Sequence, residues 1–453
     1  SEVFIIDPQN QKVVYRGPID DRLHYETQKA EAANHYLRDA LDAHLAGSPL
    51  PENVPEAPGC LITFAAKDAH TKTPPSYSAD IAPILEQHCV KCHHVGGIGP
   101  WAMTEHAMVR GWSRMMKEVL LTRRMPPGQL DPHVGRPVQE AAGLSTEELQ
   151  TLVHWIDAGA PGDDQPDPLQ ALAFSDATFS MGEPDIVLTV PVPLNLDEDI
   201  WLRAVEYVPG DRKVLHHVIT YLSSPADRTA GAGNDDGALG DSIGGFAPGR
   251  QPDIWRDDSG ALIRAGSSLL LQMHYTTTGK ATTDETKIGI YLHDKPPKYV
   301  MSGGSAGQRR FLIPPNAKEH PLEGVQEIER DALLYSLMPH MHYRGKHMKY
   351  IAEYPDGSSE VLLSVPKYDF NWQFNYQLEE PVLLPAGTRL IARGAMDNSD
   401  RNPYNPNPNM PVRFGLQTMH EMFFGFTTYR YLGDTPESLA SGKVATDSGQ
   451  GGR

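Results

Sequence analysis

Residues 214–222 have the sequence VLHHVITYL, a run of β-branched, leucine and aromatic side chains that contains an adjacent histidine pair. Runs of this composition favour strands. DIVLTV at 185–190 precedes it, and LLLQMHY at 269–275 and KIGIYL at 287–292 follow it. Turn-forming Gly, Pro and Asp residues separate these runs, which is typical of β-sandwich proteins. We therefore expect the chain to be mostly β from about residue 174 onward.

The composition is that of a folded protein with several domains. The chain has 453 residues, of which 40% are hydrophobic and 22% charged, and at roughly 150 residues per domain this length predicts about three domains. The net charge of −18 disfavours a nucleic-acid-binding surface. No apolar run reaches the ~18 residues of a transmembrane helix. The 3 Cys residues exclude a disulfide framework, whereas 19 His and 15 Met offer many metal ligands.

Histidines recur within the strand-like runs. His216 and His217 are adjacent in VLHHVITYL, His274 lies in LLLQMHY, and His340 and His342 form an H-x-H in the segment SLMPHMHYRG. Side chains alternate along a strand, so an H-x-H points both imidazoles to one face, which suits one metal ion. An adjacent pair points to opposite faces of a regular strand. Both members can bind one ion only if the strand twists or bulges.

These motifs, in this order, resemble the copper type II, ascorbate-dependent monooxygenases, the family of peptidylglycine α-hydroxylating and dopamine β-hydroxylating enzymes. The resemblance spans about residues 175–432 and implies two copper-binding, jelly-roll-like β-sandwiches at 166–298 and 299–435. It also implies an electron-transfer copper held by one triad and an O2-binding, catalytic copper held by another. The triads are His216, His217 and His274 for the first copper, and His340, His342 and Met422 for the second.

The chemistry of the implied ligands agrees with copper, because imidazole plus thioether favours an ion that cycles through Cu(I). Met422 lies in the segment QTMHEMFFG, where Met419 and His420 are its rivals. Three other histidines lie outside the matched motifs and are interpreted as structural: His293, His320 and His347.

The chain departs from this family in ways that bear on the substrate. Eukaryotic relatives are rich in disulfides, but no Cys follows Cys92 here. In the peptide-amidating relatives an Arg before the H-x-H, and an Asn and a Tyr after the copper Met, hold the carboxylate of the peptide. Met338, Phe424 and Phe426 stand at those places in this chain. We therefore expect a more apolar substrate, not a glycine-extended peptide.

A second motif, CVKCH, is the C-x-x-C-H signature of c-type haem attachment. In such a motif Cys89 and Cys92 form thioethers with the haem vinyl groups, and His93 becomes the proximal iron ligand. One motif predicts one covalent haem c, which carries single electrons. A zinc site or a disulfide at the two cysteines is the alternative.

The residues around this motif predict a small helical domain. A helix over 77–85 leads into CVKCH, and a closing helix over 145–158 has Ser145 as its N-cap and two Glu residues in its first turn. Residues 67–165 thereby resemble small cytochromes c.

Met125 in the segment RMPP is the candidate distal haem ligand, because many small cytochromes place a Met on a rigid Pro-rich loop. A thioether opposite His raises the haem potential and suits electron transfer. The other methionines of this region lie at helical spacings and are expected in the core: Met103, Met108, Met115 and Met116. The neighbouring histidines are expected to face solvent: His88, His94 and His133.

Residues 1–66 resemble the C-terminal half of a thioredoxin-like redoxin. The matching segments are SEVFIID, VVYRGPIDDR and PGCLI. We expect two strands joined by a PQN turn, and a helix over 27–46. The redox half of such a fold would lie upstream, so the numbered chain is expected to start within a domain. Cys60 is interpreted as a buried small residue rather than a reactive thiol. Residues 436–453 are expected to form a tail.

Together these features predict a multidomain, mostly β protein that acts as a haem-fed dicopper monooxygenase. It would hydroxylate a C–H bond of a small, rather apolar substrate with O2, and an external donor would reduce its haem. The alternative is a non-catalytic electron-transfer or copper-binding subunit of a larger redox assembly. A homo-oligomer or a larger complex is left open. Covalent haem attachment occurs outside the bacterial cytoplasm, so a periplasmic or secreted protein is expected.

Overall fold

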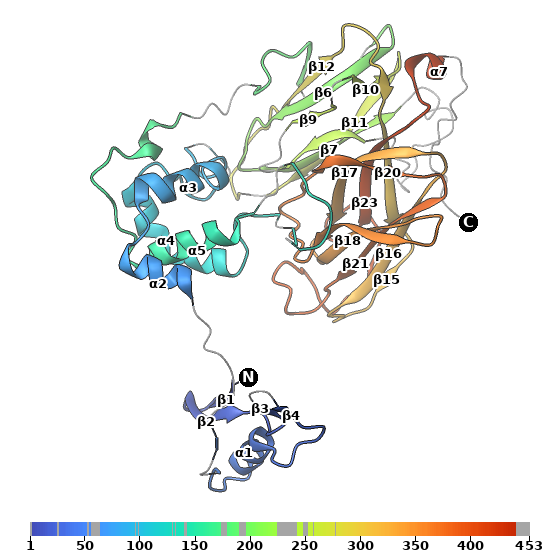
Figure 1. Ribbon diagram of the computed structural model, residues 1–453. Coiled ribbons are helices and arrows are strands. Elements are labelled where there is room, and N and C mark those ends of the chain that lie inside the picture. Colours follow the sequence, from blue (N-terminus) through green and yellow to red (C-terminus); the bar gives the residue numbers. More distant parts are fainter. Residues whose placement is uncertain are drawn as a thin grey trace. The chain divides into compact units, whose positions relative to one another are not determined.

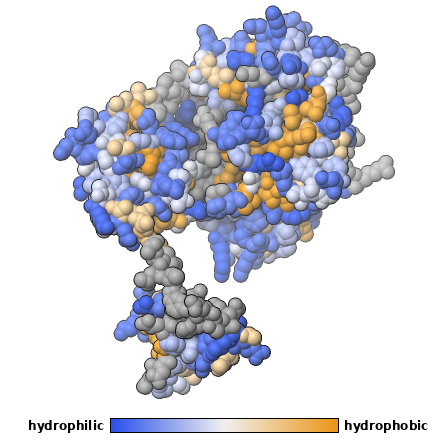
Figure 2. Space-filling view, in the orientation of Figure 1, coloured by the Kyte–Doolittle hydropathy of each residue, from blue (hydrophilic) through white to orange (hydrophobic). Residues whose placement is uncertain are grey.

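The structure is a computed structural model (Figure 1). It describes residues 2–24, 27–51, 54–55, 64–95, 97, 99–128, 130–131, 133–139, 143–173, 179–189, 196–223, 242–247, 252–256, 258–276 and 278–440. The chain divides into two compact units, Ser1–Ala69 and His70–Arg453, which are described separately. In the view of Figure 2 the surface of each unit is largely hydrophilic, with apolar areas between the polar ones.

The N-terminal unit is a small α/β arrangement. The strands β1 (Glu2–Asp7) and β2 (Lys12–Pro18) form the predicted antiparallel hairpin, and β3 (Leu23–His24) pairs with β4 (Thr27–Gln28). The helix α1 spans Tyr36–Leu45, so the predicted helix over 27–46 is wrong over residues 27–35. Cys60 lies outside the described residues.

The side chain of Asp21 explains why the helix starts late. Its carboxylate accepts hydrogen bonds from the backbone N–H groups of Ala33 and Asn34 and from the ammonium of Lys29. These contacts hold the residues before Tyr36 in a loop, because the backbone donors that would start a helix are already satisfied.

The second unit begins with a helical part. Its elements are α2 (Ala65–Lys72, across the unit boundary), the π-helix η1 (Tyr77–Ile81), α3 (Ala82–His88), α4 (His106–Leu121), α5 (Thr146–Asp157) and the 3₁₀ turn η2 (Pro168–Ala171). Ile81, Leu85, Leu152 and Trp155 are fully buried in one core. The N-cap prediction for α5 is confirmed, because Ser145 and Glu148 form a reciprocal capping box.

Two β modules follow. The first has one sheet in the order β13-β10-β6-β12-β5, with β9 beside β6, and a second sheet in the order β11-β7-β8. An apolar core that includes Leu202, Val218, Ile263 and Ile290 lies between its strands. The strands are β5 (Ile186–Thr189), β6 (Ile200–Val208), β7 (Leu215–Ser223), β8 (Ser242–Phe246), β9 (Asp253–Ile254), β10 (Ser259–Ile263), β11 (Ser268–Tyr275), β12 (Lys287–Leu292) and β13 (Tyr299–Val300).

The second β module has two antiparallel four-stranded sheets, β14-β23-β17-β20 and β16-β21-β18-β19. Met341, Tyr350 and Phe423 are among the side chains buried in its core. The strands are β14 (Ser302–Gln308), β15 (Leu312–Ile313), β16 (His320–Ile328), β17 (Ala332–Met341), β18 (Gly345–Glu353), β19 (Ser359–Val365), β20 (Tyr376–Leu384), β21 (Thr388–Met396), β22 (Val412–Arg413) and β23 (Phe423–Tyr431), and the short helix α7 (Pro436–Ala440) comes last.

A segment of the helical part, residues 133–139, pairs with the second β module, and we call it the strap. Gly135 is bridged to Leu363 of β19, and Val138 is bridged to Leu378 of β20. Both strands are edge strands, one in each sheet. The strap therefore satisfies backbone groups on two open edges, which are otherwise sites for unwanted pairing.

The fold class is confirmed at a coarse level: the protein is multidomain and mostly β, with several antiparallel sheets and a few helices. The predicted strand runs coincide with β5, β7, β11 and β12. No helix among the described residues is long and apolar enough to cross a membrane.

Candidate metal centre

Five histidines from the two β modules converge, and we call them the histidine cluster. His216 and His217 belong to β7, His274 belongs to the neighbouring β11, and His340 and His342 lie at the end of β17. Ring centroids are 4.1 Å apart for His217 and His274 and 5.4 Å apart for His340 and His342. Between the modules, the ring centroids of His217 and His340 are 6.3 Å apart, and those of His274 and His342 are 6.0 Å apart. The histidines of the two predicted triads thus meet in one place.

A β-bulge turns the adjacent histidine pair to one side. In the β7–β11 ladder His217 is opposite His274 and Leu215 is opposite Tyr275, so His216 is an extra residue in the ladder. An extra residue interrupts the regular alternation of faces. The two rings consequently lie 5.1 Å apart, and their Nδ1 atoms are 2.8 Å apart. This bulge meets the condition under which an adjacent pair can share one ion.

Amide side chains hold the outer nitrogens of the first triad. Asn371 donates an Nδ2 hydrogen to Asp369, so its Oδ1 accepts from Nε2 of His216 at 3.1 Å. Nδ1 of His216 then keeps its lone pair. The amide nitrogen of Gln272 lies 3.2 Å from Nε2 of His274. Nδ1 of His274 is buried without a hydrogen-bond partner.

In the second triad Nδ1 of each histidine is hydrogen-bonded, whereas in His216 and His274 of the first triad Nε2 contacts an amide. Gln373 donates to the Phe370 carbonyl, so its Oε1 accepts from Nδ1 of His340 at 2.6 Å. Nδ1 of His342 donates to the His420 carbonyl at 3.2 Å. Both histidines are fully buried, and their Nε2 atoms have no hydrogen-bond partner. Proteins usually orient a metal-binding imidazole in this way, with one ring N–H donating to an oxygen and the other nitrogen left for the metal.

Burial separates Met422 from its rivals. Met422 is 2% exposed, whereas Met419 is 64% exposed and the side chain of His420 also faces solvent. A thioether that shares a buried ion with His340 and His342 must itself be buried, so Met422 fits this role better than Met419 or His420 does.

A buried ion pair connects the H-x-H segment to the strand of Met422. Glu421 is fully buried and accepts from the backbone N–H groups of His342 and Arg344, at 3.0 and 2.8 Å. The guanidinium of Arg344 lies 3.5 Å from the same carboxylate and donates to the side chain of Asn398. Burial raises the pKa of Glu421 to about 7. The two segments that carry the second triad are therefore fixed to one another by charge-assisted hydrogen bonds.

Electrostatics keep the histidine cluster neutral. Burial lowers the pKa of every member, to about 4 for His274 and His340, and the pKa of His217 is lowered well below its ordinary value. Neutral imidazoles retain a lone pair on one nitrogen, which is the form that binds metals.

In the described part of the chain, no group of three or more His, Cys, Asp or Glu side chains is already positioned to hold an ion. The histidines nevertheless have the chemistry of metal ligands. Four histidines of the cluster carry a buried ring nitrogen without a partner: His217, His274, His340 and His342. Leaving such nitrogens unsatisfied costs free energy.

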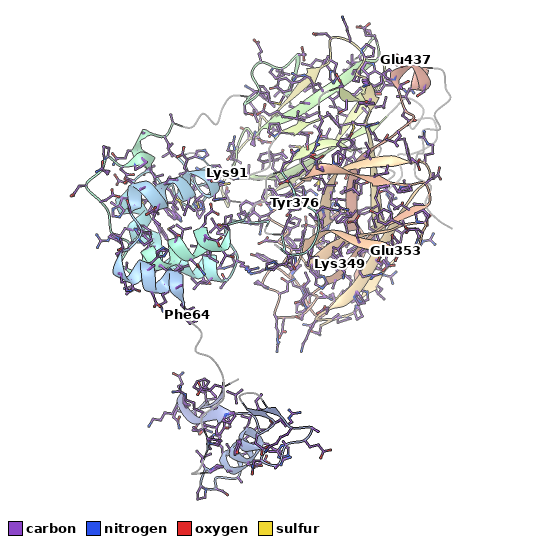
Figure 3. The ribbon with its side chains drawn as sticks, viewed as in Figure 1. Phe64, Lys91, Lys349, Glu353, Tyr376 and Glu437 are labelled. Carbon is purple, nitrogen blue, oxygen red and sulfur yellow. The ribbon has the colours of Figure 1, made fainter. Side chains whose placement is uncertain are left out.

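The haem attachment motif forms the turn that follows α3. The backbone N–H groups of Cys92 and His93 both donate to the carbonyl of Cys89, and the two thiols are not joined in a disulfide. Nδ1 of His93 donates to the Trp101 carbonyl at 3.0 Å, so the lone pair is on Nε2. This is the arrangement expected of an axial haem ligand. Lys91, between the cysteines, is labelled in Figure 3.

One face of α4 carries exposed apolar side chains. Met108, Trp112 and Met115 are 41%, 37% and 56% exposed, so the prediction that all four methionines are in the core is wrong for two of them. Met103 and Met116 are buried as predicted. Trp112 stacks on Trp101, which contacts His93.

Other predictions for the helical part have mixed outcomes. Met125 is half-buried in the loop after α4, and its role as distal ligand stays a prediction. His94 is buried and donates to the Val90 carbonyl, and His88 pairs with Glu148, so the expectation that they face solvent is wrong. His94 satisfies the backbone carbonyl of Val90, and His88 satisfies the carboxylate of Glu148 in the first turn of α5. His133 is exposed as expected.

Sequence reasoning missed the residues that orient the cluster. Phe370, Asn371 and Gln373 belong to the connection between β19 and β20, and their only local signal is the aromatic and amide composition of YDFNWQFN. The sequence offered a clearer indication that Arg344 and Glu421 belong to the centre, because each lies within two residues of a predicted ligand.

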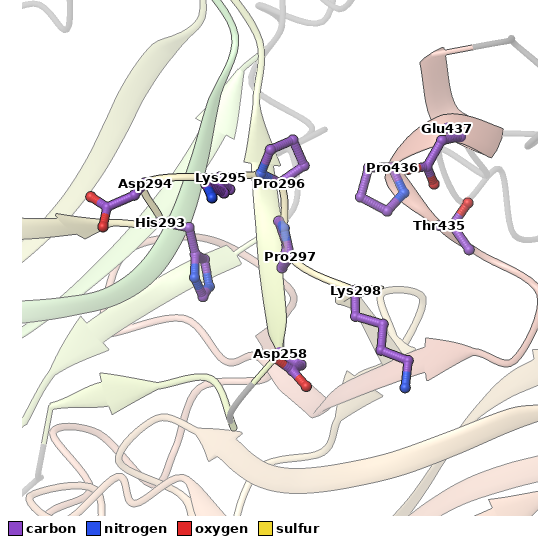
Figure 4. A pocket seen from close by; sticks show the side chains of 10 residues that line it. All are labelled: Asp258, His293, Asp294, Lys295, Pro296, Pro297, Lys298, Thr435, Pro436 and Glu437. Atoms are coloured by element: carbon purple, nitrogen blue, oxygen red, sulfur yellow. The ribbon is translucent and has the colours of Figure 1, made fainter.

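A separate hollow of about 740 Å³ lies between the β12–β13 connection and α7 (Figure 4). Its lining mixes charges of both signs, including Lys295, Lys298, Asp258 and Glu437. His293 also lines it, and its Nε2 bonds the Ser259 carbonyl, which agrees with a structural role.

No protein-family model matches the chain, and no curated protein matches it. Solved structures that share similarity with it include capsid proteins of infectious bursal disease virus. The VP2 subviral particle has 7% sequence identity and a TM-score of 0.19, and the match covers 56% of this chain and 57% of that chain. The Gx strain structure has 8% identity and a TM-score of 0.19, with 53% and 59% covered. This chain thus spans less than 60% of either capsid chain.

Proposed function

We propose that this protein is a haem-fed, two-copper monooxygenase that hydroxylates a C–H bond of a small, rather apolar substrate with O2. One observation carries the proposal. Imidazoles from both β modules present buried, unpartnered nitrogens in one cluster, and several of them have the opposite nitrogen held by an amide or a carbonyl. That combination is typical of metal ligands.

The proposal includes a finer architecture. Residues 166–298 and 299–435 are two copper-binding, jelly-roll-like sandwiches, 67–165 are a cytochrome c domain, and 1–66 are part of a thioredoxin-like domain.

The ligands follow from the predicted motifs. One copper would be held by His216, His217 and His274, and the other by His340, His342 and Met422; one haem c would be held by Cys89, Cys92 and His93, with Met125 as its distal ligand. Bound haem and copper would supply single-electron transfer and O2 activation, which side chains alone do not provide.

The surrounding residues hold these ligands and exclude water. Gln373 fixes the proton of His340 on Nδ1, and Glu421 fixes the backbone of His342. The ring of Phe370 packs against His216, His217 and His342. A dry, preorganised surrounding strengthens electrostatic interactions with the reacting groups.

The residues that replace the peptide-binding positions of the resembled family lie beside the second triad. Phe426 is 5.9 Å from His340 between ring centroids and stacks on Phe424. Met338 is directly opposite Phe426 in the β17–β23 ladder. These three side chains are apolar, which supports a rather apolar substrate, and the guanidinium of Arg309 lies 5.5 Å from the centroid of the Phe424 ring.

The partners and the location follow from the chemistry. O2, a small-molecule substrate and an external electron donor are required, and covalent haem attachment implies a periplasmic or secreted bacterial protein.

Metal analysis and native mass spectrometry of the intact protein should find one haem and two copper ions. The variant Met422→Ala should lose substrate hydroxylation and keep the haem spectrum of the unsubstituted protein. Hydroxylation retained in this variant would contradict the proposal. The absence of O2 consumption coupled to a hydroxylated product would instead favour a non-catalytic electron-transfer subunit.

A further inference from the structure

The connection between β19 and β20, residues 366–375, contacts both the helical part and the histidine cluster, and we call it the bridging loop. It joins the two edge strands with which the strap pairs. The chain therefore brings the helical part and this loop to the same side of the second β module. The proposed function gives residues of this loop the task of holding ligands and excluding water, but no role in electron transfer.

On one side the bridging loop meets the segment that carries Met125. The ammonium of Lys367 donates to the Thr122 carbonyl at 3.1 Å. The ring of Phe374 packs on Gly128 so closely that a Cβ there would lie 2.2 Å from it. Tyr376, the first residue of β20 and labelled in Figure 3, donates to the Gly128 carbonyl at 2.8 Å. These contacts flank the predicted distal haem ligand.

On the other side the bridging loop meets both triads. Phe370 stacks on His216, with centroids 4.7 Å apart and planes 10° apart, and Asn371 accepts from Nε2 of the same ring. Gln373 accepts from Nδ1 of His340. The hydroxyl of Tyr368 accepts from the N–H of Met341 and donates to its carbonyl, between the two histidines of the H-x-H.

The bridging loop thus contacts the Met125 segment through Lys367 and Phe374, and it contacts His216 through Phe370 and Asn371. The hydrogen bond from His216 to Asn371 fixes the tautomer and raises the basicity of Nδ1, and partners of this kind tune the redox properties of a bound metal. Phe370 fills the space beside the ring, so no solvent gap separates the loop from the imidazole.

We infer that the bridging loop couples the haem domain to the histidine cluster, and that Phe370 and Asn371 make His216 the position at which electrons reach the first triad. This inference rests on the proposed function. In each event the haem held by His93 would lose one electron, and the copper held by the first triad would gain it. No bond forms or breaks, and His216 keeps its proton on Nε2. Asn371 and Phe370 are positioning residues.

The test uses the full-length protein with haem and copper. The haem is reduced by a light-triggered pulse, its reoxidation is followed by absorbance, and the Cu(II) signal is followed by EPR. Asn371→Ala should slow haem reoxidation by about 10-fold, as expected for loss of a partner behind a metal ligand, and should change the Cu(II) signal of the first triad. Asn371→Asp retains an acceptor oxygen and should restore most of the rate.

Asn375 provides a matched control in the same loop, because its side chain donates to Asp253 rather than to a histidine. Asn375→Ala should leave the rate of haem reoxidation unchanged. Phe370→Leu is an independent second variant that keeps an apolar side chain and removes the stacked ring. It should also slow the electron transfer.

The outcomes separate the two proposals. If the unsubstituted protein binds no copper, both the proposed function and this inference fail. If it binds two coppers and hydroxylates, but Asn371→Ala and Phe370→Leu reoxidise haem at the normal rate with full metal content, only the coupling role of the loop is overturned.

Discussion

The hydrogen bond between Gln373 and His340 gives the sharpest quantitative test of the candidate centre. Both residues are buried, and Oε1 of Gln373 lies 2.6 Å from Nδ1 of His340. Replacing Gln373 by Leu keeps a side chain of similar size but removes the acceptor. It also removes the donor to the Phe370 carbonyl, at 3.1 Å.

The size of the effect follows from these two bonds. A buried N–H left without an acceptor costs about 1–3 kcal/mol, and the lost bond to the carbonyl adds about 0.5–1.5 kcal/mol. The metal-free protein should therefore lose about 1.5–4.5 kcal/mol of stability. His340 would also lose its fixed tautomer, so copper affinity at the second triad should fall about 10- to 100-fold.

Copper affinity is the cleaner assay, because unfolding of a multidomain chain is not a two-state process. Titration with Cu(I) against a competing chelator should show that Gln373→Leu weakens one of two sites. Gln373→Glu keeps an oxygen towards Nδ1 and should recover most of the affinity. Gln326→Leu is the matched control, because Gln326 accepts from the Thr427 hydroxyl and contacts no histidine.

Two results would refute this reasoning. Unchanged affinity in Gln373→Leu would show that His340 does not depend on the amide, or that it binds no metal. An equal loss in Gln326→Leu would show that the effect comes from general destabilisation of the module.

Three further predictions concern the framework around the centre. Glu421→Ala should destabilise the second β module by about 3–5 kcal/mol, since Arg344 would stay buried without its counter-charge; hydrogen exchange of β17 and β23 measures this, and unchanged protection would contradict it. Ser145→Ala should remove about 1 kcal/mol from the start of α5, seen as faster amide exchange in that helix alone. Gly135→Val should detach the strap, because Gly135 has φ +109° and a Cβ there would lie 2.9 Å from the Leu362 carbonyl oxygen. Limited proteolysis should then cut the strap faster. An unchanged cleavage rate would argue against docking of the strap on the second β module.

Local patterns predicted the parts of the fold that depend on neighbours in sequence. Strand β11 spans Ser268–Tyr275, close to the run LLLQMHY, and Ser145 caps α5 through the Glu three residues later. The late start of α1 could not be predicted in this way, because Asp21 acts on residues 12 and 13 positions further along the chain. The exposure of Met108 and Met115 was missed for a different reason. Helical spacing predicts a face, but not what covers it.

The ligand candidates were visible in the sequence, whereas their arrangement was not. The alternation of strand faces places His340 and His342 on one side, and the structure brings them 5.4 Å apart. The same rule sends His216 and His217 to opposite sides, and only the bulge at His216 reverses this. A bulge is set by the pairing with β11, so no local pattern of residues 214–222 reveals it.

The bridging loop shows why the second layer of a metal centre escapes sequence reasoning. Asn371 and Asn375 are four residues apart in one loop, but the first bonds a histidine 155 residues away and the second bonds Asp253. The difference is made by Asp369, whose carboxylate accepts from both the backbone N–H and the Nδ2 of Asn371. With its donor used locally, Asn371 can offer only an oxygen to His216, and this oxygen decides which ring nitrogen keeps the lone pair. A residue that is unremarkable in the sequence therefore sets the chemistry of a ligand that the sequence does reveal.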